Sequence, residues 1–259
     1  MSITEDAPAP PTARRSPLQL PGRARRASPW WWLVVVSSVL LVAALAVMTV
    51  WGFASRETQV SRYRVLGTVS AIELDVGAAD VEIVGGAPVV EVRRTAEYAF
   101  GRPPDQTRRL DGDVLQITSR CPDTVVGTCD AAYRIAVRDN VQVSVITTSG
   151  RVRVSALNGS ARLQTGSGAI AVDGFCGFQL IATSASGDVR SAAGCSPDRM
   201  ELRSTGGDVH ALVPAGRYRV DASSSRGSTE VRNLTETEDA PFAVQAISGT
   251  GDVLVEGQG

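Results

Sequence analysis

Two stretches, "GAIAVDGFCG" (residues 168–177) and "GDVRSAAGCS" (residues 187–196), carry the same features in the same order. Each begins at a turn glycine, continues as a short alternating run, and reaches a cysteine eight residues after that glycine. Similar runs recur at intervals of 18 to 22 residues, and their first apolar residues are Val152, Ile170, Val189, Val209, Val231 and Val253. Alternation of apolar and polar residues between Gly, Ser and Asp turns is typical of β-strands.

A second phrase lies between these runs, as in "ARLQTGSG" (161–168) and "FQLIATSASG" (178–187). Each unit of about 20 residues therefore holds two short strands and two turns, with no helical periodicity. Such a repeat predicts an all-β fold, a parallel β-solenoid of two-strand coils over residues 67–259, with 67–148 as a less regular first part. A β-sandwich is the alternative, since it also has short strands and regular turns. The expected repeat-turn residues are Gly150, Gly168, Gly187, Asp188, Gly207, Asp208, Gly251 and Asp252.

Glycine and asparagine are expected at tight corners that require a positive φ. The offset of eight residues from the turn glycine marks a fixed corner of the coil, and it reaches Cys176 from Gly168 and Cys195 from Gly187. Equivalent residues of adjacent coils stack about 4.7–4.9 Å apart, which lies within the Cα separation that a disulfide requires. We therefore predict a Cys176–Cys195 disulfide and, by elimination, a Cys121–Cys129 disulfide. A pair of free buried thiols is the alternative.

Residues 30–53 form an uncharged apolar run of 24 residues, which is long enough to cross a bilayer as a helix. Its ends carry all four tryptophans of the chain, as expected for anchors at the membrane interface: Trp30, Trp31, Trp32 and Trp51. A cleaved signal peptide and a buried core helix are the alternatives, although a signal-peptide core usually has only about 7–15 apolar residues.

The charges that flank this run predict its orientation. Five arginines (14, 15, 23, 25 and 26) and two acidic residues precede it, and the excess of arginine after it is weaker. The positive-inside rule places the N-terminus in the cytoplasm and the C-terminal domain outside, in a single-pass cell-membrane protein. We expect a disordered Arg/Pro-rich tail over 1–29, a transmembrane helix over 30–53, a juxtamembrane linker over 54–66 and the extracytoplasmic solenoid over 67–259.

No motif in the chain predicts a catalytic, cofactor-binding or metal-binding residue. "GSGAIA" (166–171) matches a dinucleotide-binding pattern, but it leads into a strand and repeats the turn found elsewhere. His210 is the only histidine and is expected at an exposed strand position. Asp188 and Asp208 take equivalent places in neighbouring coils, where a turn role is favoured over a cation site or an acid–base pair.

The charge composition argues against nucleic acid as a partner. The formal net charge is −1, and all 26 basic residues apart from His210 are arginine. The pairs Arg93–Arg94 and Arg108–Arg109 and the alternating Arg151 and Arg153 are expected on solvated faces; binding of acidic glycans or lipid headgroups is the functional alternative. The partners considered are the lipid bilayer, through residues 30–53, and a cell-wall polymer or another envelope protein.

The two phrases, written SG-[DN]-V-x-[VA] and φ-x-L-x-[TS]-x-S-G, resemble those of the bacterial "putative adhesin" family of membrane-anchored β-strand-repeat proteins, a domain of unknown function. The resemblance covers about residues 67–259 and is strongest from residue 148 onward. It implies the repeat fold and no catalytic residue. The cysteine-bearing insertion at 119–130 departs from the family pattern.

These features favour a non-enzymatic, membrane-anchored surface-interaction or adhesin-like module. An extracytoplasmic sensor or accessory of an envelope-stress system is the first alternative. A polysaccharide-active β-helix enzyme is the second, and it is disfavoured because aromatic platforms are few.

Overall fold

The structure is a computed structural model that describes residues 29–54, 56–99, 103–122 and 129–258. A single helix, α1 (Pro29–Ala54), precedes the strands in the chain. Its segment Trp30–Trp51 is long and apolar enough to cross a membrane. The large apolar side chains of this segment are exposed, Trp30 and Trp51 included.

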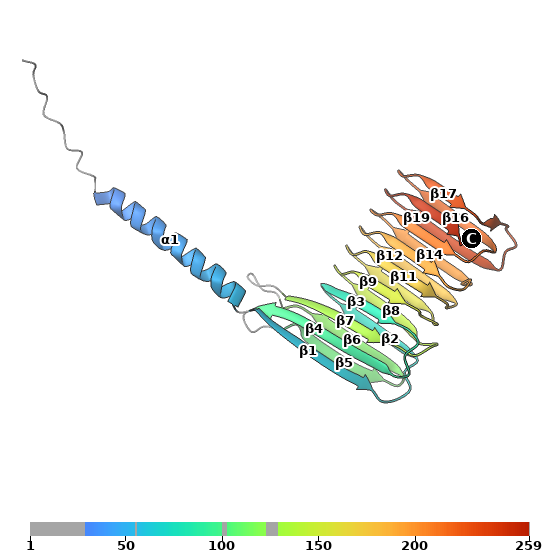
Figure 1. The fold of residues 1–259 in the computed structure, drawn as a ribbon, viewed down its shortest axis with the longest axis horizontal. Helices are drawn as coiled ribbons and strands as arrows, with labels where there is room; N and C mark the ends of the chain where they lie inside the picture. The colour runs from blue at the N-terminus through green and yellow to red at the C-terminus, as the bar shows by residue number, and fades with distance from the viewer. Residues whose placement is uncertain (1–28, 55, 100–102, 123–128, 259) are drawn as a thin grey trace, which may run out of the picture. The chain divides into compact units, whose positions relative to one another are not determined.

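The described residues after α1 form two ten-stranded sheets, which we call sheet A and sheet B (Figure 1). In spatial order sheet A contains β1 (Arg56–Val65), β4 (Val90–Ala99), β7 (Cys129–Ala136), β3 (Ala79–Val84), β9 (Val152–Ser155), β11 (Ile170–Phe175), β13 (Val189–Ala193), β15 (Val209–Val213), β20 (Val253–Gly257) and β17 (Thr229–Arg232). Sheet B contains β18 (Thr235–Glu236), β16 (Arg217–Ser224), β19 (Phe242–Ser248), β14 (Arg199–Ser204), β12 (Gln179–Ser184), β10 (Ala161–Thr165), β8 (Gln142–Thr147), β2 (Ala71–Val76), β6 (Val114–Arg120) and β5 (Asp105–Asp111).

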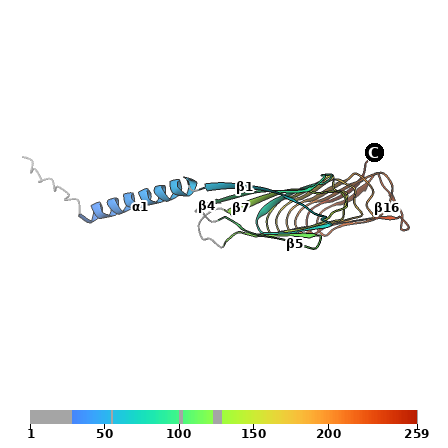
Figure 2. The ribbon, with the colours of Figure 1, turned by 90° about the horizontal axis from the view of Figure 1, so that it is seen from below.

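A strand of sheet B followed by a strand of sheet A makes one coil, and the coils stack with their strands parallel and in register (Figure 2). The apolar side of each strand within the stack faces the interior between the sheets, whereas the edge strands β5 and β18 are largely exposed. Leu163, Leu180 and Leu202 lie there from sheet B, opposite Val172 and Val209 from sheet A. The predicted parallel β-solenoid of two-strand coils is confirmed.

Coils β8–β9 through β14–β15 stack in the order of the chain, but the last two coils do not. β20 lies between β15 and β17, and β19 lies between β14 and β16, so the final coil of the sequence is inserted before its predecessor. The register differs there as well, because Val253 pairs with Thr229, not with Val231. The equal spacing that placed Val231 and Val253 in one series is therefore misleading. The turn glycine of that coil is Gly227, which stacks on Gly251.

The first part of the domain is less regular because it includes antiparallel strands. β1 pairs with β4, β4 with β7, and β5 with β6, all antiparallel. Residues 56–65, expected within a linker, form strand β1 instead. The reason is its alternation near the C-terminal end, where Tyr63 and Val65 pack against the core.

Candidate anion-binding face of the solenoid

A row of arginines crosses the outer face of sheet A. Strand register aligns one residue from each strand into this row, from β1 to β17: Arg62, Arg93, Arg134, Glu82, Arg153, Ala171, Arg190, His210, Leu254 and Glu230. We call its five arginines (62, 93, 134, 153 and 190) the arginine row. The arginines of the row lie on every strand or every second strand from β1 to β13. Neighbouring strands lie about 4.7–4.9 Å apart, so positive charge recurs at one or two of these spacings.

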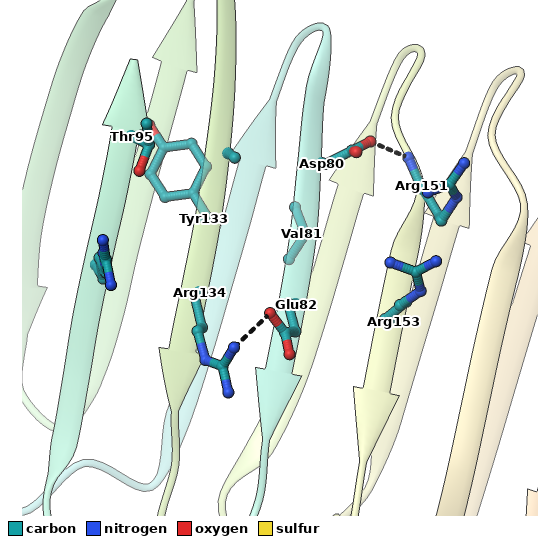
Figure 3. A pocket seen from close by; sticks show the side chains of 10 residues that line it. Asp80, Val81, Glu82, Thr95, Tyr133, Arg134, Arg151 and Arg153 are labelled. Carbon is teal, nitrogen blue, oxygen red and sulfur yellow. Dashed lines mark hydrogen bonds and ion pairs between the residues drawn. The ribbon is translucent and has the colours of Figure 1, made fainter. Parts of the chain in front are cut away.

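The row is hollowed at β4, β7, β3 and β9 into a shallow pocket of about 330 Å³. Figure 3 shows Arg134 beside Glu82, and Arg151 and Arg153 along the next strand. Arg93 completes the basic lining from β4. Four arginines thus line this pocket against two carboxylates, those of Asp80 and Glu82.

Both carboxylates of the pocket already have partners. Glu82 Oε2 lies 3.2 Å from Arg134 Nη1, and Asp80 Oδ1 accepts a hydrogen bond of 2.8 Å from the backbone N–H of Arg151 (Figure 3). In the described part of the chain, the guanidinium groups of Arg93, Arg151 and Arg153 form no ion pair. The pocket therefore keeps a positive excess that is free to bind an anion.

The other two arginines of the row pair with partly exposed carboxylates. Arg62 lies 3.2 Å from Glu91, and Arg190 lies 3.6 Å from Asp188, with more than half of each arginine side chain exposed. Exposed ion pairs of this kind contribute only about 0–1 kcal/mol. A multivalent anion can therefore exchange with these carboxylates at little cost.

The outer face of sheet B has no comparable row. The corresponding line of residues from β5 to β16 mixes both signs: Arg109, Gln116, Glu73, Ser144, Arg162, Ile181, Glu201, Gln245 and Asp221. The positive stripe thus belongs to sheet A alone among the described strands.

The stacked aspartates at the coil corner support the backbone. Asp188 Oδ1 accepts a hydrogen bond from the N–H of Asp208 (3.0 Å), and Asp208 Oδ1 accepts one from Asp252 (2.9 Å). Asp252 Oδ1 accepts from the N–H and the hydroxyl of Ser228, which lower the pKa of that carboxyl, the backbone bond most. Each carboxylate therefore links one coil to the next. No group of three metal-ligating side chains occurs among the described residues.

The repeat-turn glycines are required by close stacking, and the expectation of a positive φ there was wrong. Gly174, Gly86 and Asn140 have a positive φ, but the repeat-turn glycines do not. A Cβ at Gly168 would lie 1.8 Å from Gly150 O, and one at Gly187 would lie 2.2 Å from Gly168 O. A side chain at these turns would collide with the backbone of the preceding coil.

A ladder of buried hydroxyls accompanies these glycines, and sequence reasoning did not identify its role. Ser184 Oγ donates to Gly168 O (2.9 Å) and accepts from Gly187 N–H (2.8 Å). Ser204 and Ser248 make the same two bonds in their coils. The signal was the [TS] position of the second phrase, which the solenoid places at the inner side of each turn.

Both expected disulfides are present in the structure. Cys176 and Cys195 are bonded with their Cα atoms 4.8 Å apart, and Cys121 and Cys129 with theirs 5.9 Å apart. Asn158 lies at the same offset of eight residues, counted from Gly150. Its carbonyl oxygen accepts a hydrogen bond from the N–H of Asn140 in the adjacent coil.

Three further features singled out in the sequence, two residues and one turn, take these places. His210 lies on the outer face of sheet A, half-buried, with Nε2 3.9 Å from a Glu256 carboxylate oxygen. The "GSGAIA" turn leads into strand β11, so the helix that a dinucleotide site requires is missing there. Arg94 was expected beside Arg93 on a solvated face, but it is buried, because β4 alternates and its neighbours Val92 and Ala96 face the interior.

Residues 130–256 match the family model described as Toastrack DUF4097. No curated protein matches the chain.

Among solved structures, a putative cell adhesion protein from Clostridium sporogenes ATCC 15579 is 8% identical with a TM-score of 0.46; 78% of this chain and 100% of that chain are covered. A putative adhesin from Bacteroides fragilis NCTC 9343 is 12% identical with a TM-score of 0.44, and the match covers 78% of this chain and 97% of that chain. A putative lipid binding protein from Parabacteroides distasonis ATCC 8503 is 12% identical with a TM-score of 0.35, and the match covers 78% of this chain and 96% of that chain. The family resemblance inferred from the repeat phrases is confirmed over residues 130–256, which match the Toastrack DUF4097 family model.

Proposed function

We propose that this protein is a non-enzymatic, membrane-anchored surface module that binds a linear polyanion of the cell envelope along the arginine row. The observation that carries the proposal is the register of sheet A, which aligns five arginines from five strands on one outer face. A polymer with a regular spacing of phosphodiester or carboxylate groups can contact several of them at once. Because the guanidinium fork matches carboxylate and phosphate oxygens, arginine suits this role better than a point charge would.

The pocket at β4, β7, β3 and β9 is the centre of the proposed site. Arg93 and Arg153 have no carboxylate partner within the described residues, so a bound anionic group would face little competition there. Arg62 and Arg190 would add weaker contacts on either side after releasing Glu91 and Asp188. Several weak contacts on one rigid sheet give avidity without a deep cavity.

We propose further that residues 30–53 remain as an uncleaved span, with residues 1–29 in the cytoplasm and the solenoid outside. The arginine excess before the span, the tryptophans at its ends and the two disulfides support this arrangement. Protease added to intact protoplasts should digest the chain beyond residue 56. Protection of that region would contradict the orientation, and a mature N-terminus near residue 55 would identify a cleaved signal peptide.

The polyanion proposal can be tested with the full chain in nanodiscs of zwitterionic lipid. We expect it to bind poly(glycerol phosphate), and the double variant Arg93→Gln/Arg153→Gln to bind at least tenfold more weakly. Binding should weaken with salt, and the variant should have a shallower salt dependence, by about one unit of slope per lost contact.

The matched control is Arg162→Gln/Arg219→Gln, which removes two exposed arginines from the outer face of sheet B. It should bind within about twofold of the wild type, because the net charge changes equally but the arginine row is intact. Equal losses in both double variants would mean that only net charge matters, and unchanged binding by the sheet A variant would refute the site.

A further inference from the structure

The interior of the solenoid at its first strands holds a buried arginine with no counter-ion. Arg94, on β4, is only 7% exposed. Its Nη1 donates to Gln106 Oε1 (3.2 Å) and its Nη2 donates to the carbonyl oxygen of Pro104 (2.7 Å), both neutral acceptors. Among the described residues no carboxylate pairs with it. Arginine stays charged at every physiological pH, and a buried charge without an opposite charge is unfavourable.

Polar atoms without partners surround this guanidinium. Arg94 Nε, Gln106 Nε2, Tyr133 OH and Tyr63 OH are all buried and form no hydrogen bond with any residue that the structure describes. Tyr133 is directly opposite Arg94 in the β4–β7 register, and it is only 1% exposed. Gln106 reaches Arg94 from the facing sheet. All four atoms can donate a hydrogen bond, and the two nitrogens can only donate.

The cluster adjoins an opening between the edge strands β1 and β5 at Tyr63, which belongs to both the cluster and the opening. A pocket of about 370 Å³ is lined by Tyr63, Val65, Leu66, Leu110 and Leu115 and by the arginines 64, 108 and 109. The Arg108 guanidinium lies 4.6 Å from the centre of the Tyr63 ring. Burial raises the pKa of Tyr63, while the nearby charges of Arg108 and Arg94 oppose that rise. Tyr63 therefore stands between the opening and the buried arginine.

We propose that this end of the solenoid binds a small oxyanion, a carboxylate or phosphate group, at Arg94, Gln106 and Tyr133, with the apolar residues of the pocket at Tyr63 holding a hydrocarbon substituent of the ligand. An oxyanion neutralises the guanidinium, and its oxygens accept from the unpartnered N–H and O–H groups. Val65, Leu110 and Leu115 supply an apolar surface at the entrance. The site faces the interior of the domain, so it is separate from the arginine row on the outer face.

The test uses calorimetric titration of the full chain in zwitterionic nanodiscs, at constant ionic strength in chloride and with empty nanodiscs subtracted. The probes are inorganic phosphate, acetate and hexanoate. We expect one site per chain, with hexanoate at least tenfold tighter than acetate. Binding of acetate or phosphate with no gain for hexanoate would keep the oxyanion site and overturn the hydrocarbon part.

Three variants locate the site. Arg94→Met should weaken hexanoate binding at least tenfold, and Tyr133→Phe, which removes one hydroxyl and leaves the ring, should weaken it several-fold. Arg162→Met is the matched control, because Arg162 is an exposed arginine on the outer face of sheet B, outside both proposed sites; it should bind hexanoate within twofold of the wild type. If Arg94→Met does not fold, the hexanoate affinity of Tyr133→Phe still tests whether the ligand binds at this cluster. Failure of all three probes to bind, or equal binding by Tyr133→Phe, would overturn the proposal in favour of ordered water alone.

Discussion

Substitution of one turn glycine tests whether close stacking of the coils holds the domain together. In Gly187→Ala the new Cβ would lie 2.2 Å from Gly168 O, which is 1.2 Å closer than the 3.4 Å at which ordinary contact begins. The nearest atoms belong to the backbone, so the coils must separate locally. That movement breaks the two hydrogen bonds of Ser184, each worth about 1 kcal/mol. Overpacking adds about 1–3 kcal/mol, so we expect a loss of about 3–5 kcal/mol.

The measurement is urea unfolding of the full chain in detergent micelles, followed by circular dichroism of the strands. With a slope of about 2–3 kcal/mol per molar urea, the expected loss of about 3–5 kcal/mol lowers the midpoint by about 1–2.5 M. Gly77→Ala is the control, because Gly77 is also a turn glycine but its nearest foreign atom, Ser119 O, would be 3.9 Å from the new Cβ. It should stay within about 1 kcal/mol of the wild type. If the two variants differ by less than 1 kcal/mol, close stacking does not explain the glycines.

Three other changes probe the links between coils. Ser184→Ala leaves Gly187 N–H and Gly168 O without their hydroxyl partner and should lower the free energy of unfolding by about 1–3 kcal/mol in the same assay; no change would mean that water replaces the hydroxyl. Replacing Cys176 and Cys195 with serine should cost about 3 kcal/mol, since the disulfide spans 19 residues; a loss below 1 kcal/mol, measured without reductant, would contradict this. Ser228 lowers the folded-state pKa of Asp252, so its carboxylate stabilises the fold above its ordinary pKa of about 4 and loses this effect as the pH falls through the lower folded value. Asp252→Asn should therefore reduce the acid sensitivity of the urea midpoint between about pH 5 and pH 2, and an unchanged pH profile would count against the corner bond.

Local patterns in the sequence predicted the coil, because each coil is built from contacts close in the chain. Alternation marked the strands, and the offset from the turn glycine placed Cys176 against Cys195. The same alternation could have placed Arg94 correctly, because Val90 and Val92 precede it at inward positions of β4. Two adjacent arginines suggest a solvated segment, and this pairing with Arg93 predicts the wrong face of β4 for Arg94.

The arginine row could not be predicted, because its members come together only through the register of distant strands. Arg62, Arg93 and Arg134 are about 30 to 40 residues apart in the chain, and two of the pairings that align them are antiparallel. The repeat phrases do not cover these strands. A row of charge across a sheet is thus a property of the stacking, not of any one repeat.

The inserted final coil shows why repeat counting cannot give the stacking order. β16 pairs only with β18 and β19, and β17 pairs only with β20, so the outermost coil is held by strands that follow it in the chain. Backbone hydrogen bonds between parallel strands are the same whichever repeat supplies them. The stacking order of the coils must therefore come from the shape and length of the connections between their strands. The β17–β19 connection carries β18, which pairs with Arg217 and Tyr218 on the outer edge of β16 before the chain returns. Part of that edge is covered by this short strand, which leaves less of it open to pair with another chain.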